Sequence, residues 1–117
     1  MTSRVVDGPP DPAPLIRSSG DPACGALVVL SGPAGEDGAD PAGGGAGLEA
    51  FLEELEEAAL ARHEVRRCRL ALGREGPAGE GEVVAVVRAP HRAAAFEAVR
   101  WALAAVRDRL RGAGDPA

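Results

Sequence analysis

Residues 83–110 read VVAVVRAPHRAAAFEAVRWALAAVRDRL, and this stretch decides the fold of the 117-residue chain. The run Val83–Val87 contains no polar residue, which predicts a strand buried on both faces. After Pro90 the apolar residues return at helical spacing, on one stripe that holds Phe96, Val99, Leu103, Val106 and Leu110. The stretch therefore predicts a buried strand followed by a long helix that packs through this stripe.

A second amphipathic helix is predicted upstream, from Gly47 to about His63. Its apolar residues recur at i, i+3, i+4 and i+7, while glutamates cover the opposite side. The apolar positions are Leu48, Phe51, Leu52, Leu55 and Ala59. The glutamate run of this helix is best explained as a solvated face, because no histidine follows at i+4 to complete a metal site.

Between the two helices, polar and apolar residues alternate over Arg67–Leu72, with Cys68 and Leu70 among the apolar positions. This period of two is typical of a strand with one face in water. A glycine-rich turn, Gly73–Gly81, joins this strand to Val83–Val87, so the two strands are expected to pair antiparallel.

The N-terminal part of the chain is predicted to contribute one further buried strand, the glycine-bounded apolar run Gly25–Gly32. Before it, Ser3–Val6 could form a short strand and Pro14–Ser18 one helical turn, within a segment, residues 1–20, that is expected to be loosely ordered. Two more segments are expected to lack regular structure: a flexible Gly/Pro-rich loop at 33–47 and a disordered tail at 112–117.

These elements predict a single α+β domain over residues 1–117, with helices packed on a mainly antiparallel sheet. Trp101 lies off the main stripe of the last helix, which gives that helix a second apolar face. This face is either a partner surface or the place where Trp101 covers the N-terminal segment.

Composition excludes several classes of function. With 18 acidic and 13 basic residues the net charge is −5, which argues against a nucleic-acid partner. No apolar run approaches the roughly 20 residues of a membrane span, and residues 1–20 do not read as a secretory signal, so a cytoplasmic protein is expected. Cys24 and Cys68 are too far apart for a zinc motif, so two buried, reduced thiols and no metal are expected. All 13 basic residues are arginine, so the chain offers no lysine amine for covalent catalysis.

The one concentrated polar feature is His91-Arg92, at the predicted junction of strand and helix. Unpaired backbone N–H groups and the helix dipole favour anions at a helix start, so this pair is a candidate anion site. The alternative is structural, with His91 packed against the turn and Arg92 solvated.

Three stretches resemble one family: Asp21–Gly32, the dipeptide Gly79-Glu80, and above all Ala89–Ala98, with its sequence APHRAAAFEA. Together they are similar to the large, catalytic subunit of molybdopterin synthase, over about Asp21–Leu110 with a gap. The His-Arg-x-x-Ala-Phe portion is the most specific part. The resemblance implies an α/β-hammerhead fold and no bound cofactor.

The resemblance also implies roles for particular residues. His91 and Arg92 match the family's anion-binding pair, and Arg107 falls where the family has a catalytic pocket lysine. The family's second His-Arg pair corresponds to Leu72-Gly73, and its substrate-binding arginine after the first strand falls in Pro33–Glu36, where this chain has none. The family's Pro-Ile-Trp-Lys segment, which follows the last helix, has no counterpart in residues 112–117.

Members of this family act on cyclic pyranopterin monophosphate, a pterin phosphate. They form a dimer that binds two ubiquitin-like small subunits, whose C-terminal thiocarboxylate donates the sulfur of molybdopterin. The resemblance therefore implies a sulfurtransferase of molybdenum-cofactor biosynthesis, in a homodimer or heterotetramer. Because several cationic positions are replaced, we expect catalysis to be impaired or lost. The alternative is a non-catalytic binding module that pairs with the small subunit or with a genuine large subunit.

Overall fold

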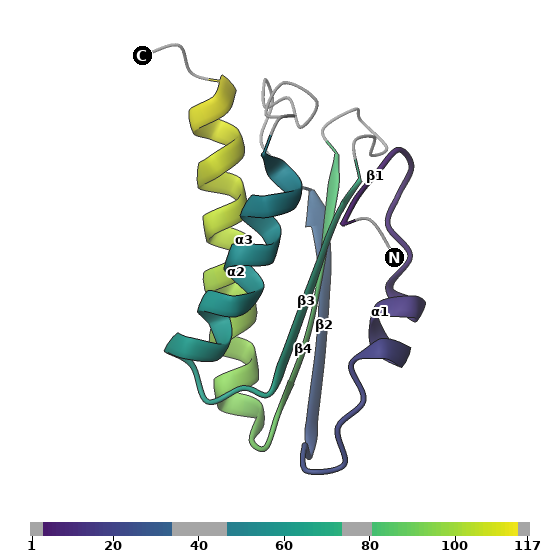
Figure 1. Cartoon of the computed structure of the whole chain (residues 1–117), viewed down its shortest axis with the longest axis vertical. Helices are drawn as coiled ribbons and strands as arrows, with labels where there is room; N and C mark the ends of the chain where they lie inside the picture. Colours follow the sequence, from purple (N-terminus) through teal and green to yellow (C-terminus); the bar gives the residue numbers. More distant parts are fainter. Residues whose placement is uncertain (1–3, 34–46, 74–80, 115–117) are drawn as a thin grey trace.

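Two long helices cover one face of a sheet and a short helix lies on the other face (Figure 1). The computed structural model describes residues 4–33, 47–73 and 81–114, with side chains to Leu110. Within these residues, the sheet has four strands in the order β1-β3-β4-β2. The expected α+β class is confirmed.

The sheet is built around β4 (Glu82–Ala89), which pairs antiparallel with β3 (Arg67–Gly73) on one side and with β2 (Ala26–Pro33) on the other. β1 (Val5–Val6) adds a short parallel edge next to the end of β3. The antiparallel pairing of β3 with β4 was expected from the turn between them and is confirmed. β4 is buried along Val83–Val87, as its unbroken apolar run predicts.

The main core lies between the sheet and the helices α2 (Leu48–Arg62) and α3 (Arg92–Gly114). The predicted stripe of α2 supplies Leu48, Leu52, Leu55 and Ala59, all of which are buried. On the opposite face, α1 (Pro12–Ser18) packs Leu15 against Ala71, Val84 and Val86. β4 is thus covered on both faces, which explains why its sequence does not alternate.

β2 is not the fully buried strand that its sequence predicts. Leu27, Val29 and Leu30 are 42%, 39% and 40% exposed. β2 pairs only with β4 among the described residues, so it is an edge strand. α1 covers Val84 and Val86 of the neighbouring strand, and the apolar residues of β2 lie outside that cover. Sequence alone does not tell a central apolar strand from an edge one.

The apolar stripe of α3 is shifted from the predicted one. Val99, Leu103, Val106 and Leu110 are buried as expected, but Phe96 is 50% exposed. Alanines occupy the first turns of the buried face: Ala95, Ala98 and Ala102. Because each residue turns a helix by about 100°, Phe96 falls at the margin of the face that Ala95 occupies.

Trp101 does not cover the N-terminal segment. Its ring lies 5.6 Å from the His63 ring and 5.2 Å from the Arg62 guanidinium carbon, at the end of α2. That alternative is therefore wrong, and Trp101 joins the two long helices instead.

The N-terminal segment contains the expected short strand and a helix longer than the expected turn. Asp11 caps α1 by accepting a hydrogen bond from the Ala13 N–H, 3.0 Å away. Arg88 of β4 donates to the Ser19 hydroxyl (3.1 Å) and to the Ile16 carbonyl (3.3 Å). These hydrogen bonds join the end of α1 and Ser19 to β4.

The structure describes only a few residues of the other two segments that are expected to be irregular, 33–47 and 112–117. Pro33 belongs to β2 and Gly47 precedes α2 with φ 90°, while residues 34–46 lie outside the described part. α3 runs to Gly114, so its helix includes residues 112–114, which were assigned to the tail; residues 115–117 are not described.

Candidate functional site

His91 and Arg92 lie at the junction between β4 and α3, because Pro90 follows the last residue of the strand and Arg92 begins the helix. Both side chains are exposed, and neither forms a hydrogen bond or an ion pair with another described residue. Two groups capable of positive charge thus stand at the start of a long helix, where the dipole also favours an anion. The arrangement can hold an anion at the surface.

Arg107, the other expected site residue, lies far along the same helix. Its Nη2 donates to the Pro33 carbonyl at the end of β2, 3.5 Å away, and its side chain is exposed. Fifteen residues separate it from Arg92, which is about 22 Å along a straight helix. The structure therefore does not bring Arg107 to the His91-Arg92 pair within one protomer.

Leu72-Gly73, the counterpart of a second His-Arg pair, is structural in this chain. Leu72 is fully buried, and its N–H donates to the Arg4 carbonyl at 2.7 Å. A Cβ on Gly73 would clash with the Gly8 carbonyl oxygen and would lie 2.8 Å from Pro10. An arginine therefore does not fit at position 73 while the N-terminal segment is packed there.

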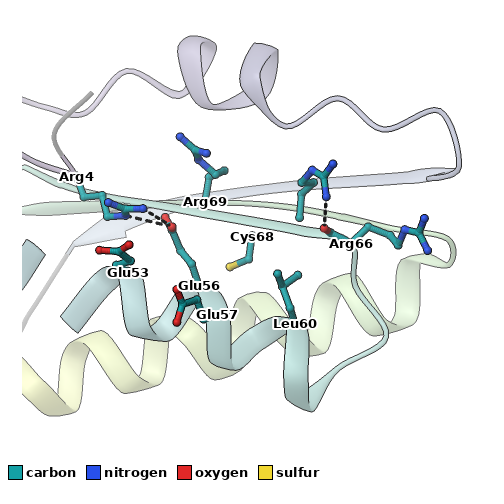
Figure 2. A pocket seen from close by; sticks show the side chains of 9 residues that line it. Arg4, Glu53, Glu56, Glu57, Leu60, Arg66, Cys68 and Arg69 are labelled. Carbon is teal, nitrogen blue, oxygen red and sulfur yellow. Dashed lines mark hydrogen bonds and ion pairs between the residues drawn. The ribbon is translucent and has the colours of Figure 1, made fainter. Parts of the chain in front are cut away.

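A small pocket of about 210 Å³ opens elsewhere, between α2 and the outer edge of β3 (Figure 2). Its walls carry many charges of both signs, with one thiol. The lining residues are Arg4, Glu53, Glu56, Glu57, Leu60, Arg66, Arg67, Cys68 and Arg69. Figure 2 shows the Arg69 side chain pointing toward the α1 side of the sheet, while Glu57 and Leu60 approach from α2.

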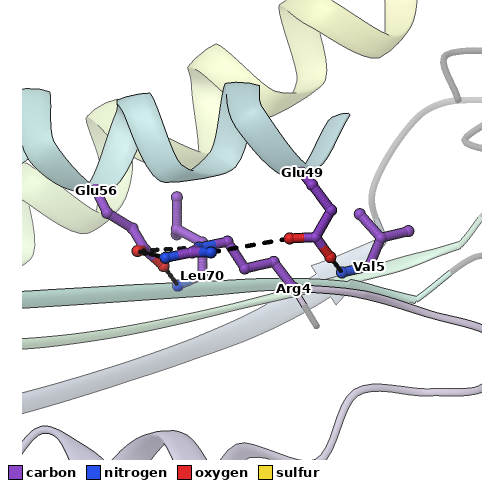
Figure 3. A network of polar contacts seen from close by, with 5 residues as sticks. All are labelled: Arg4, Val5, Glu49, Glu56 and Leu70. Atoms are coloured by element: carbon purple, nitrogen blue, oxygen red, sulfur yellow. Dashed lines mark hydrogen bonds and ion pairs between the residues drawn. The ribbon is translucent and has the colours of Figure 1, made fainter. Parts of the chain in front are cut away.

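A polar network closes one end of this pocket (Figure 3). Arg4 donates from Nε and Nη2 to Glu56 Oε1, at 3.1 and 2.9 Å, and Glu56 Oε2 accepts the Leu70 N–H at 2.8 Å. Glu49 accepts the Val5 N–H at 2.9 Å, and its other oxygen lies 3.8 Å from Arg4 Nη1. Two carboxylates of α2 thus fasten the N-terminal segment and the edge of β3.

Different causes shift the pKa of Arg4, in this network, and of Cys68, beside it. The hydrogen bond that Arg4 donates to Glu56 raises the pKa of the Arg4 guanidinium, so Arg4 stays charged. Desolvation, with a further contribution from the Glu56 charge, raises the pKa of the Cys68 thiol to about 12. Cys68 is therefore a protonated, unreactive thiol at neutral pH.

The sequence singled out neither Arg4 nor Glu56. Glu56 stood in a glutamate run that looks like a solvated face, yet it is only 8% exposed. A signal does exist, because Glu56 is one position from the buried Leu55 and therefore borders the apolar stripe. The sequence pattern around Glu56 does not reveal that Arg4 is its partner, because Arg4 lies 52 residues away in the sequence.

No group of three or more His, Cys, Asp or Glu side chains within residues 4–33, 47–73 and 81–114 is placed to hold a metal ion. In the same part of the chain, no helix combines the length and apolarity that crossing a membrane requires.

The comparison with family models gives one match, to the family described as MoaE protein, over residues 44–109. The matched region runs through α2, β3, β4 and most of α3, and it includes the junction that carries His91 and Arg92. Because it covers more than half of the chain, the chain belongs to the MoaE protein family. The resemblance to the large subunit of molybdopterin synthase is thereby confirmed at the level of family, and it assigns a large-subunit-like role in molybdenum-cofactor biosynthesis. No curated protein matches the chain.

Proposed function

We propose that this protein is a large-subunit-like component of molybdopterin synthesis that binds the ubiquitin-like small subunit and has impaired or lost sulfur-transfer activity. The observation that carries the proposal is the family match over residues 44–109, which contains the exposed His91-Arg92 pair at the start of α3. This pair is the proposed contact for the phosphate of cyclic pyranopterin monophosphate.

Reduced catalysis is supported by the other positions at which the family carries positive groups, because none of them adds a charge beside that pair. Sulfur transfer to an anionic substrate needs positive groups fixed where negative charge collects. Leu72 is buried, Gly73 leaves no room for a side chain, and Arg107 stands about 22 Å along α3 from Arg92. Arg107 keeps the charge of the family's lysine but not its compact amine. We propose that Arg107 serves the small subunit's tail or a site completed by another protomer.

The proposed partner surface is the outer edge of β2, beside which no strand lies within residues 4–33, 47–73 and 81–114. Ala26–Pro33 contains no charged residue, and its exposed Leu27, Val29 and Leu30 lie on both faces of the strand. In a chain with a net charge of −5, an uncharged edge lets two copies approach without like-charge repulsion. Two β2 strands related by a two-fold axis would extend the sheet, which supports the homodimer that the family implies.

The test is reconstitution. Purified protein is titrated with thiocarboxylated small subunit in a calorimeter, and the mixture is then given cyclic pyranopterin monophosphate and assayed for molybdopterin. We expect binding of the small subunit together with little or no molybdopterin. Absence of binding would overturn the proposal, and turnover equal to that of a lysine-containing large subunit would overturn its catalytic part.

Arg107→Ala separates the two proposed sites. It should weaken docking of the small subunit more than binding of inorganic phosphate, because Arg107 is remote from His91-Arg92. If Arg107→Ala lowers the affinities for the small subunit and for inorganic phosphate equally, Arg107 and Arg92 act in one site.

A further inference from the structure

The outer edge of β3 is only partly protected. β1 pairs with Leu72 and Gly73 and reaches no further along β3. Glu56 takes the Leu70 N–H, so a side chain stands in for a neighbouring strand at that position. Beyond it, at Arg67–Arg69, the described residues provide no strand on this side, and the pocket of about 210 Å³ lies there.

The two walls of this pocket differ in chemistry. Arg67 and Arg69 project from the same face of β3, because side chains alternate along a strand, and that face is the α1 side (Figure 2). The α2 wall presents Leu60, which is 45% exposed, above the buried Cys68, and it carries Glu53, Glu56 and Glu57 on the turns before Leu60. The arginine side is therefore cationic, and the α2 side is apolar at Leu60 and acidic toward Glu57.

The size of the pocket indicates what it accommodates. Sites for small molecules usually have about 300–1,000 Å³, so a pocket of about 210 Å³ is small for a cofactor. An unpaired strand edge offers main-chain hydrogen bonds to an extended segment, and such a segment places alternate side chains on the two faces.

We infer that the open edge of β3 at Arg67–Arg69 binds an extended segment of a partner protein with acidic residues on one face and apolar residues on the other. The acidic residues would face Arg67 and Arg69, since opposite charges on neighbouring strands attract. The apolar residues would face Leu60. This inference does not rest on the proposed function, because the site uses neither the β2 edge nor His91-Arg92.

The probe is the peptide acetyl-Val-Glu-Val-Glu-Val-amide, titrated into the whole protein by calorimetry at low salt. Its control is the matching peptide with lysine in place of glutamate. We expect the glutamate peptide to bind at least tenfold more tightly. Failure of the glutamate peptide to bind, or equal affinity for both peptides, would overturn the inference.

Charge reversal locates the site. Arg69→Glu should lower the affinity for the glutamate peptide at least tenfold and raise the affinity for the lysine peptide. Arg67→Glu provides a second variant should the first fail to fold. Arg100→Glu, at an exposed arginine of α3, is the matched control and should change neither affinity. An equal effect of Arg100→Glu would mean that the peptide responds to net charge alone.

Hydrogen exchange distinguishes the two sheet edges. The glutamate peptide should slow exchange of the Cys68 amide, which points to the outer edge because the Leu70 and Leu72 N–H groups do, and should leave the amides at 27–30 unchanged. Protection confined to residues 27–30 would move the peptide to β2 and contradict the inference.

Discussion

The two edges of the sheet have opposite chemistry. The β2 edge is eight residues long, uncharged and rich in half-exposed aliphatic side chains. The other edge, formed by β1 and β3, is short, charged and fastened by Arg4 and Glu56. The chain's own residues close the β1–β3 edge from Leu70 to Gly73 and leave it open at Arg67–Arg69, whereas no described strand lies beside the outer edge of β2. A strand edge exposes unpaired N–H and C=O groups, and these can be bonded by a carboxylate of the same chain or by a strand of another chain.

The largest expected effect comes from opening the fastened edge. Glu56→Ala leaves the Leu70 N–H without its acceptor and Arg4 without its main partner. We expect a loss of about 2–4 kcal/mol in the free energy of unfolding, measured by urea denaturation. Glu57→Ala is the control, because Glu57 is an exposed neighbour on α2, and it should change stability by no more than about 0.5 kcal/mol. Equal losses in the two variants would show that the network does not hold the edge.

At the outer edge of β2, which no described strand covers, a substitution should change self-association and leave folding stability nearly unchanged. Val29→Lys places a charge in the centre of β2, and we expect it to weaken self-association at least tenfold, or about 1.4 kcal/mol, in equilibrium sedimentation. Leu60→Lys introduces the same charge at a residue of similar exposure on α2, and it should leave self-association unchanged. If the parent protein stays monomeric at micromolar concentration, the proposed dimer through β2 does not form and that proposal is wrong.

A smaller effect is expected from Cys68, which lies beside the fastened edge. Its folded-state pKa of about 12 exceeds that of an unfolded thiol, so its contribution to stability is complete below about pH 9 and is lost as the pH rises toward 12. We expect the free energy of unfolding to fall by about 1 kcal/mol between pH 9 and pH 10. Lys and Tyr, which titrate nearby, are absent from the sequence. Cys68→Ala should flatten this pH dependence, and Cys24→Ala should retain it; a flat profile in the parent would contradict the raised pKa.

The pattern of apolar residues predicts which segments form helices and strands, but not which strands lie next to one another in the sheet. It predicted α2, β3 and β4 because each pattern is complete within a few turns or a single strand. It placed β2 in the interior, since the same apolar run suits a central strand and an edge that is to be covered. The site behaved in the same way. His91 and Arg92 are adjacent in sequence and are found together, whereas Arg4 and Glu56 meet only in the folded chain.

The most direct test of the proposed function concerns His91 and Arg92, the pair that we propose as the contact for the substrate phosphate. Cyclic pyranopterin monophosphate is titrated by calorimetry into the parent protein, Arg92→Ala and the control Arg100→Ala. Removing the guanidinium at the start of α3 should lower the affinity at least tenfold, because it removes a charge-assisted contact to the phosphate, while Arg100→Ala should bind as the parent does. Binding by Arg92→Ala that equals the parent's would make the His-Arg pair structural and would contradict a pterin-phosphate site at this helix.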